Sequence, residues 1–178
     1  MIWNKFKSAI CYGLLAVGVL FSVAGCKVYS FSGVITGGAK TMSIQTFSNN
    51  AANGPSSISQ QFTEDFKDFF QRNTTLKLVP RDGDLQFEGA IISYDIAPAA
   101  IEKQDGRDQA GLNRLTIQVR VKYTNTLDSK QDFEQTFQSQ EDFPGTQDAS
   151  QINANQTKIR EINRRIINDA FNKSVANW

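Results

Sequence analysis

The sequence of 178 residues contains no histidine. Histidine is the commonest general base of enzymes and the commonest protein ligand of transition metals, and the Ser-His-Asp and Cys-His arrangements both require it. Its absence therefore excludes most familiar hydrolase designs. The acidic residues fit helix surfaces and turns, and the segment Asp105–Asp108 lacks the ligand spacing of a calcium-binding hand. We expect a protein that is not an enzyme and that holds no metal and no cofactor.

Cysteine is almost as scarce, because the chain contains only Cys11 and Cys26. Cys11 falls inside an amino-terminal apolar stretch that we expect to be removed, so the remaining chain has one cysteine and cannot form an internal disulfide. Its stability must therefore come from a packed core. Residues 26–178 are enough for one domain that buries such a core without covalent cross-links.

Neither sign of charge dominates, because nineteen Lys and Arg residues face eighteen Asp and Glu residues. Without Lys5 and Lys7 the count becomes seventeen basic against eighteen acidic residues. A protein that coats nucleic acid or anionic lipid carries a larger excess of positive charge than this. We therefore expect no nucleic-acid partner, and any anion-binding site must be local.

The chain also lacks an apolar run long enough to span a membrane. Its longest run, Ala9–Val23, has about 15 residues, whereas a transmembrane helix needs roughly 20. Lys5 and Lys7 precede this run and small residues end it, which is the pattern of an export signal. We predict a removed signal peptide over residues 1–25, and a short membrane anchor is the alternative.

The end of this run carries a more specific motif. Val23-Ala24-Gly25-Cys26 resembles the lipobox of bacterial lipoproteins, in which small residues precede the cut and the thiol after it takes up a diacylglycerol. Two or three acyl chains, such as palmitate, anchor a protein firmly, whereas one chain binds only marginally. We predict that lipid on Cys26 anchors the chain. Lys27 favours the outer membrane, because aspartate at this position often means retention at the inner membrane.

Periodicity predicts the secondary structure of the remaining chain. Alternating patterns predict strands over residues 29–35, 42–47, 76–79, 85–96 and 114–124, and a further strand from 133. A capping box of Ser57 and Gln60 predicts the start of a helix that ends near Asn73. A second helix is predicted from about Ser150 to Ala176. Strands and helices do not alternate, so we predict an α+β two-layer sandwich, with two helices on one face of a mostly antiparallel sheet.

Three local features complete this prediction. The strand over 85–96 changes the face on which its apolar residues lie, which indicates a bulge near Gly89-Ala90. Residues 97–113 show neither a helical nor a strand period, and they are predicted to form a long mobile loop or a hairpin tip. On the second helix, Glu161 is placed to pair with Arg165 one turn later.

Several segments together resemble LptE, the lipopolysaccharide-assembly lipoprotein family, in the form found in Bacteroidetes-like bacteria. None of them is a catalytic motif, but they occur in order behind a lipobox. They are Cys26 followed by Tyr29–Gly33, then Phe62–Glu64, Gly83–Ile91, Asn113–Val121, and the ending Ala170–Lys173 to Trp178.

The resemblance implies a non-enzymatic function in the outer membrane. Members of the family sit as a plug in a large barrel, LptD, help that barrel to assemble, and assist the insertion of lipopolysaccharide into the outer leaflet. The expected partners are therefore an LptD-type barrel, lipopolysaccharide and the membrane, which the lipid anchor reaches from the periplasmic side. The alternative is a pilot or scaffold lipoprotein of another secretion or assembly complex.

Lipid A bears phosphates, and cations on a rigid strand can bind them. Arg114, Arg120 and Lys122 alternate with buried positions on one predicted strand and should share its polar face. We take these three residues as the candidate lipopolysaccharide-binding residues. The alternative is that they form an ordinary solvated face.

Overall fold

A computed structural model describes residues 36–104 and 107–175. The predicted signal peptide over 1–25, the lipidation site Cys26 and the strand predicted over 29–35 all lie outside these residues and stay predictions. Within the described ranges, no helix combines the length and the apolar character needed to cross a membrane.

The described strands form one mixed sheet in the order β3-β1-β4-β5-β6, and β2 also pairs with β4. The long strands β4, β5 and β6 pair antiparallel, whereas the short strands β1, β2 and β3 pair parallel. The α+β class is therefore confirmed, with parallel pairing confined to one edge. The strands are β1 (Thr41–Ile44), β2 (Ser48–Asn49), β3 (Lys77–Leu78), β4 (Leu85–Gln104), β5 (Arg107–Asn125) and β6 (Phe133–Pro144).

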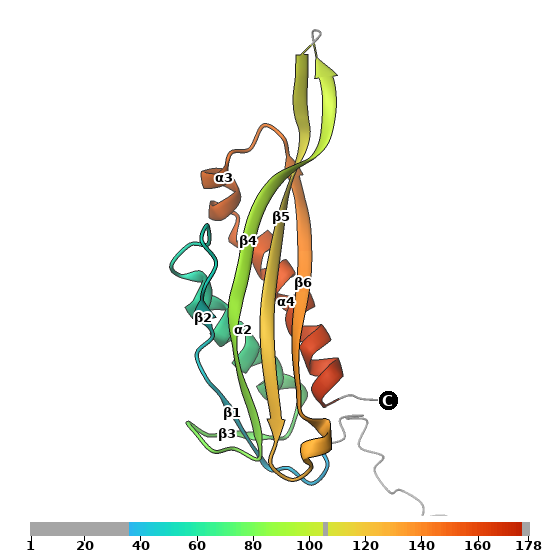
Figure 1. Cartoon of the computed structure of the whole chain (residues 1–178). Helices are drawn as coiled ribbons and strands as arrows, with labels where there is room; N and C mark the ends of the chain where they lie inside the picture. Colours follow the sequence, from blue (N-terminus) through green and yellow to red (C-terminus); the bar gives the residue numbers. More distant parts are fainter. Residues whose placement is uncertain (1–35, 105–106, 176–178) are drawn as a thin grey trace, which may run out of the picture. The chain divides into compact units, whose positions relative to one another are not determined.

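The helices cover one face of this sheet, as Figure 1 shows for α2 (Ile58–Asn73) and α4 (Gln156–Ser174) behind the three long strands. Each helix presents an apolar stripe at helical spacing to the sheet. The buried apolar stripe of α2 is Ile58, Phe62, Phe66 and Phe70, and that of α4 is Ile159, Ile162, Ile166, Ile167, Ala170 and Phe171. The predicted two-layer arrangement is confirmed.

Phenylalanine rings fill the space between α2 and the sheet. The rings of Phe66 and Phe70 are stacked at 4.7 Å, and Phe87 of β4 meets Phe70 edge-on, also at 4.7 Å. Phe47, from the segment between β1 and β2, closes the cluster against Phe62 at 5.0 Å. Each fully buried phenylalanine contributes about 1.5–3 kcal/mol through burial alone, so this cluster dominates the stability of the layer.

The predicted start of the first helix at Ser57 and its end near Asn73 are confirmed, because α2 spans Ile58–Asn73 with Ser57 at the N-cap position. The predicted capping box does not form, since the backbone of Ser57 is already helical and its side chain makes no capping hydrogen bond. The predicted continuity of the second helix is wrong. The carboxyl-terminal helix is two helices, α3 (Ala149–Ala154) and α4, which meet at Asn155. The side chain of Asn155 accepts a hydrogen bond from the backbone N–H of Lys158 at 3.2 Å. The cap formed by the side chain of Asn155 therefore starts a new helix at a position where the apolar period predicted one continuous helix.

The predicted bulge exists but lies further along β4. The register shifts between Ile91 and Ser93, so both Ile91 and Tyr94 point into the core. Position 89, where the bulge was predicted, requires glycine for a different structural reason. A Cβ atom there would collide with the carbonyl oxygen of Arg120 and with the ring of Phe47.

Of the two alternatives predicted for residues 97–113, the hairpin is confirmed and the long loop is wrong, because residues 97–104 and 107–113 lie in paired strands. Strand pairing continues from Ala97 opposite Arg114 to Gln104 opposite Arg107, with register shifts after Pro98. Pairing between the two strands supplies the backbone hydrogen bonds that the local composition did not indicate. In Figure 1 this hairpin extends beyond the ends of β2 and β6.

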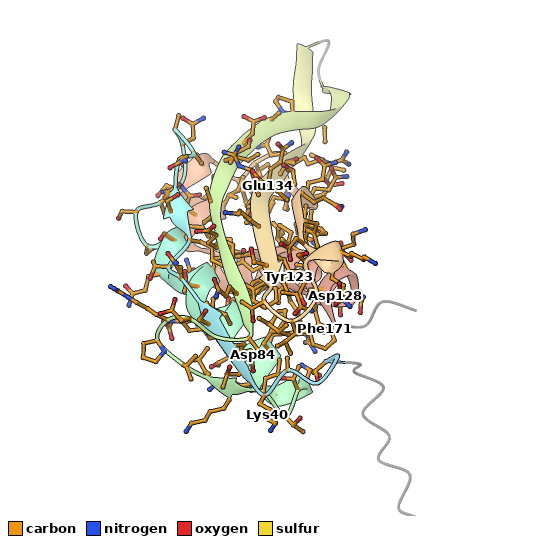
Figure 2. All side chains as sticks on the ribbon, turned by 60° about the horizontal axis from the view of Figure 1, so that its bottom comes forward. Lys40, Asp84, Tyr123, Asp128, Glu134 and Phe171 are labelled. Atoms are coloured by element: carbon orange, nitrogen blue, oxygen red, sulfur yellow. The ribbon has the colours of Figure 1, made fainter. Side chains whose placement is uncertain are left out.

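The sheet is fixed at its other end by Asp84, which lies beside Lys40 in Figure 2. One carboxylate oxygen of Asp84 accepts hydrogen bonds from the backbone N–H of Lys40 at 2.8 Å and from the backbone and hydroxyl of Thr41, both at 2.9 Å. These bonds, chiefly that from Lys40, hold the pKa of Asp84 below its usual value. The start of β1 is thereby joined to the start of β4.

Candidate functional site

The candidate cations lie on the outer sheet face, defined here as the side of β4, β5 and β6 that points away from the helices. Alternate residues of β5, including Leu115, Val119 and Val121, are buried against the helices. Since side chains alternate along a strand, Arg114, Arg120 and Lys122 share the opposite side. The predicted common face is confirmed, but a binding role is a separate question.

Arg114 forms the best-defined ion pair of this face. It lies directly opposite Asp142 of β6, and its Nε and Nη2 atoms donate to the two carboxylate oxygens at 2.7 and 2.9 Å. These hydrogen bonds raise the pKa of Arg114 and lower that of Asp142. An anion at this position would therefore have to displace a bidentate carboxylate.

Arg120 and Lys122 form a separate cluster with two glutamates. Lys122 donates to Glu88 of β4 at 2.6 Å, and Arg120 lies 3.8 Å from Glu134 of β6. The hydrogen bond to Glu88 raises the pKa of Lys122. These four residues line a shallow hollow of about 290 Å³. Arg114 lies six strand positions from Arg120, roughly 20 Å along β5, so the three candidates do not form one site.

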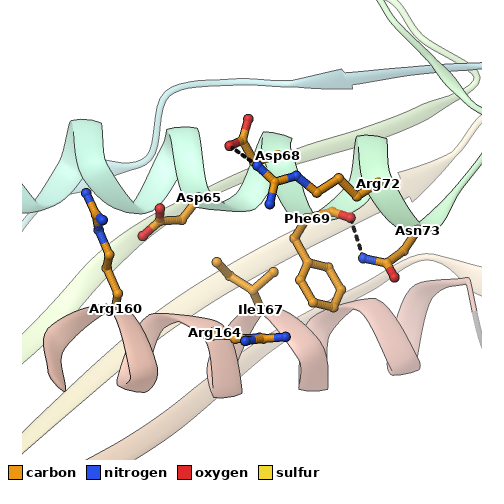
Figure 3. Close-up of a pocket in the computed structure, with 8 residues that line it drawn as sticks. All are labelled: Asp65, Asp68, Phe69, Arg72, Asn73, Arg160, Arg164 and Ile167. Atoms are coloured by element: carbon orange, nitrogen blue, oxygen red, sulfur yellow. Dashed lines mark hydrogen bonds and ion pairs between the residues drawn. The ribbon is translucent and has the colours of Figure 1, made fainter. Parts of the chain in front are cut away.

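A second charged surface lies between the two long helices and is called here the interhelix groove. It has a volume of about 490 Å³, and Figure 3 shows its eight lining side chains. They are Asp65, Asp68, Phe69, Arg72 and Asn73 of α2 with Arg160, Arg164 and Ile167 of α4. The sequence placed the α4 arginines off the apolar stripe but did not indicate that α2 brings a third arginine to them.

The groove contains one close ion pair and one perturbed carboxyl group. Arg72 and Asp68 lie 3.2 Å apart, one turn from each other on α2. Burial raises the pKa of Asp65, although a hydrogen bond from Asn163 and the charge of Arg160 act in the opposite direction. Asp65 therefore binds a proton more readily than an exposed aspartate does.

The predicted pair of Glu161 and Arg165 does not form. Arg165 points instead to the edge of β6, where it donates to Glu141 at 2.9 Å and to the carbonyl oxygen of Gln140 at 2.8 Å. Lys158 adds a hydrogen bond to the carbonyl oxygen of Asp142 at 2.7 Å. Strand β6 is the outermost strand of the described sheet, and its edge is the stronger partner for Arg165 because it offers carbonyl oxygens as well as a carboxylate.

The acidic residues do not gather into a metal site in the part of the chain that the structure describes, where no group of three or more ligating side chains occurs. The two charged surfaces hold ion pairs and open hollows. Their geometry is suited to binding charged groups by contact.

Comparison with protein families decides the identity of the fold. Residues 39–174 match the family model described as "LptE: Lipopolysaccharide-assembly". The chain belongs to the LptE family. The match spans α2, α4 and all six described strands, so the resemblance seen in the sequence is confirmed. Membership in the LptE family supports a role in lipopolysaccharide assembly.

One solved structure supports the fold, and two lipoproteins are similar at lower scores. The hypothetical protein CT253 from Chlamydia trachomatis is similar with a TM-score of 0.53 at 9% sequence identity, over 78% of this chain and 99% of that one. Lipoprotein B from Nitrosomonas europaea has a TM-score of 0.49 at 12% identity, over 75% and 80% of the two chains. Rare lipoprotein B from Shewanella oneidensis has a TM-score of 0.46 at 10% identity, over 75% and 90%. No curated protein sequence matches the chain significantly.

Proposed function

We propose that this LptE-family protein is an outer-membrane lipoprotein that plugs an LptD-type barrel, helps it to assemble and assists the insertion of lipopolysaccharide into the outer leaflet. The family match over residues 39–174 is the observation that carries the proposal. The outer sheet face adds physical support. A barrel lumen is polar, and a face covered with paired charges can lie against it without burying an unpaired ion.

Anchoring through Cys26 on the periplasmic side is part of the proposal. The test is metabolic labelling with palmitate in the producing bacterium, followed by membrane fractionation. Wild-type protein should carry label and sediment with the outer membrane, whereas Cys26→Ser should carry none. Unlabelled, soluble wild-type protein with a free thiol at Cys26 would remove the anchor from the account.

Association with the barrel is tested by co-purification. Tagged protein is isolated from detergent-solubilised outer membranes, and the proteins bound to it are identified by mass spectrometry. The proposal predicts an LptD-type barrel in near-stoichiometric amount. Recovery of components of another secretion or assembly complex, without that barrel, would favour the pilot or scaffold function instead.

The outer sheet face is proposed to contact lipid A phosphates through Arg114, Arg120 and Lys122. Each cation has a carboxylate partner within 4.0 Å, so a phosphate must compete with that partner. The cluster of Arg120 and Lys122 is the more accessible part, because its Arg120–Glu134 pair is long at 3.8 Å. This contact works by binding alone, in keeping with a protein that is not an enzyme and uses no cofactor.

The variant Arg120→Ala/Lys122→Ala tests this contact in a lipopolysaccharide-binding assay. We expect weaker binding, since two cations are lost from one hollow. Gln118→Ala, a neutral change on the same face, is the matched control. Unchanged affinity of the double variant would exclude these two residues from binding.

A further inference from the structure

The two α4 arginines of the interhelix groove differ from the cations of the outer sheet face in their partners. On the sheet, Arg114, Arg120 and Lys122 each lie within 4.0 Å of a carboxylate oxygen. On α4, neither Arg160 nor Arg164 has such a partner among residues 36–104 and 107–175. Their positive charge is therefore available to a ligand without the displacement of a close ion pair.

The groove brings these arginines beside an apolar surface. Figure 3 shows Phe69 and Ile167 between the two helices, with Arg164 next to them on α4, Asn73 on the far side of Phe69, and the guanidinium group of Arg72 turned toward Asp68 on α2. A second hollow of about 430 Å³ shares Phe69, Asn73 and Arg164 with the groove. Arg164 therefore lines two adjoining hollows, and a ligand there can meet a guanidinium group and an aromatic ring together.

Two carboxylates also line the groove, and each is accounted for. Asp68 is held by Arg72 at 3.2 Å. Asp65 lies beside Arg160 in Figure 3, at the far end from Asn73, and it accepts a hydrogen bond from the buried Asn163 at 3.4 Å. Three arginines against two aspartates leave the lining with a positive formal balance. The end near Arg164 and Asn73 is the more favourable for an anion.

We propose that the interhelix groove binds a phosphate group of lipopolysaccharide, with Arg164 as its main ligand and with Arg160 and Arg72 adding to the positive potential. A guanidinium group presents parallel N–H donors that match the oxygens of a phosphate. Phe69 and Ile167 would contact the apolar part of the lipid next to that phosphate. This inference rests on the proposed function, because it takes lipopolysaccharide as the ligand.

The test is the binding of three probes to the full chain. They are lipopolysaccharide dispersed in detergent, the same lipopolysaccharide after enzymatic removal of its phosphates, and inorganic phosphate. We expect Arg160→Gln/Arg164→Gln to bind intact lipopolysaccharide at least tenfold more weakly than wild type. Wild type and variant should differ little with the dephosphorylated probe. Inorganic phosphate should bind wild type far more weakly than intact lipopolysaccharide does.

Two further variants make the test specific. Lys77→Gln/Lys130→Gln removes the same charge from exposed positions outside both proposed contacts and should bind like wild type. Arg164→Lys keeps the charge but loses the planar donor pair, and its affinity should fall between those of wild type and the double variant. Urea unfolding of every variant shows whether the fold is intact before binding is compared.

Each outcome has a distinct meaning. If wild type does not bind intact lipopolysaccharide, the proposed lipopolysaccharide contact itself fails. If wild type binds and the folded groove variant binds equally well, the groove is overturned while the proposed function stands. An equal loss in the Lys77 and Lys130 control would reveal general attraction between charges, and phosphate binding as tight as lipopolysaccharide would reveal a plain anion site; either result overturns the proposal.

Discussion

The outer sheet face and the interhelix groove both carry arginines near carboxylates, but they balance charge differently. On the sheet, strand register places Arg114 opposite Asp142 and Lys122 beside Glu88, so cations and acids meet in fixed pairs. In the groove, Arg160 and Arg164 follow each other on one helix and meet no carboxylate within 4.0 Å in the described ranges. A phosphate must therefore compete with a carboxylate on the outer sheet face, whereas at Arg160 and Arg164 it displaces no close ion pair.

The largest expected effect is the difference in stability lost when a side chain is truncated on the helix side of the sheet and on its outer face. Phe66 is fully buried and packs against four other phenylalanine rings, so Phe66→Ala should lower the free energy of unfolding by about 3–5 kcal/mol. Gln118→Ala, on the outer face, should change it by no more than about 0.5 kcal/mol. Urea unfolding followed by circular dichroism measures both. Equal effects would show that the core does not lie where the structure places it.

A smaller loss of stability is expected when one methyl group is added to Gly89 of β4. Gly89→Ala would drive a Cβ against the carbonyl oxygen of Arg120 and the ring of Phe47, and should cost about 1–3 kcal/mol. Gly54→Ala is the matched control, because its Cβ would meet neighbours only at 3.4 Å or more. Comparison of the two urea midpoints decides the matter. A neutral Gly89→Ala would mean that β4 and β5 are not as close as described.

The carboxyl group of Asp142 should make the outer face sensitive to acid. Because Arg114 holds the pKa of Asp142 below its usual value of 3.8, the ionised form stabilises the fold above that pH. This stabilisation is lost as the pH falls below 3.8 through the lowered pKa. Asp142→Asn should therefore lower the urea midpoint slightly at pH 7 and flatten its decline in acid. An unchanged decline would mean that the pair contributes nothing to stability.

The smallest expected effect is a gain in stability, and it comes from removing the charge of Asp65 in the interhelix groove. Burial raises the pKa of Asp65, so its contribution to stability is full below the usual value of 3.8 and is lost as the pH rises through the raised pKa. At pH 7 its charge is unfavourable, and Asp65→Asn should raise the free energy of unfolding by no more than about 0.5 kcal/mol. Midpoints measured at pH 3 and pH 7 test the sign. A loss of stability at pH 7 would show that Arg160 outweighs burial.

Local patterns were sufficient to predict most elements. The phenylalanine stripe of α2 and the strict alternation from Leu115 to Tyr123 each fixed an element and its buried side. The prediction was incomplete or wrong where pairing or capping decides the outcome. Residues 97–113 lack a period of their own, so the sequence left a loop and a hairpin tip as alternatives, and pairing across the hairpin makes 97–104 and 107–113 strands. The break at Asn155 depends on a side-chain cap that periodicity does not detect.

The candidate site was predicted less completely, because partners across strands and helices are not encoded by spacing along one element. Arg114, Arg120 and Lys122 were placed on the correct face, but their partners Asp142, Glu134 and Glu88 come from neighbouring strands. That Arg72 and Arg164 line one groove depends on the packing of α2 against α4. No sequence period reports that packing.

The central claim is that this chain acts in lipopolysaccharide assembly by contact. The most direct measurement is the amount of newly made lipopolysaccharide that reaches the cell surface after depletion of the protein in the producing bacterium. The account predicts a marked fall in surface lipopolysaccharide that the wild-type chain restores, with the precursor retained inside the envelope. Normal surface delivery in fully depleted cells would contradict it.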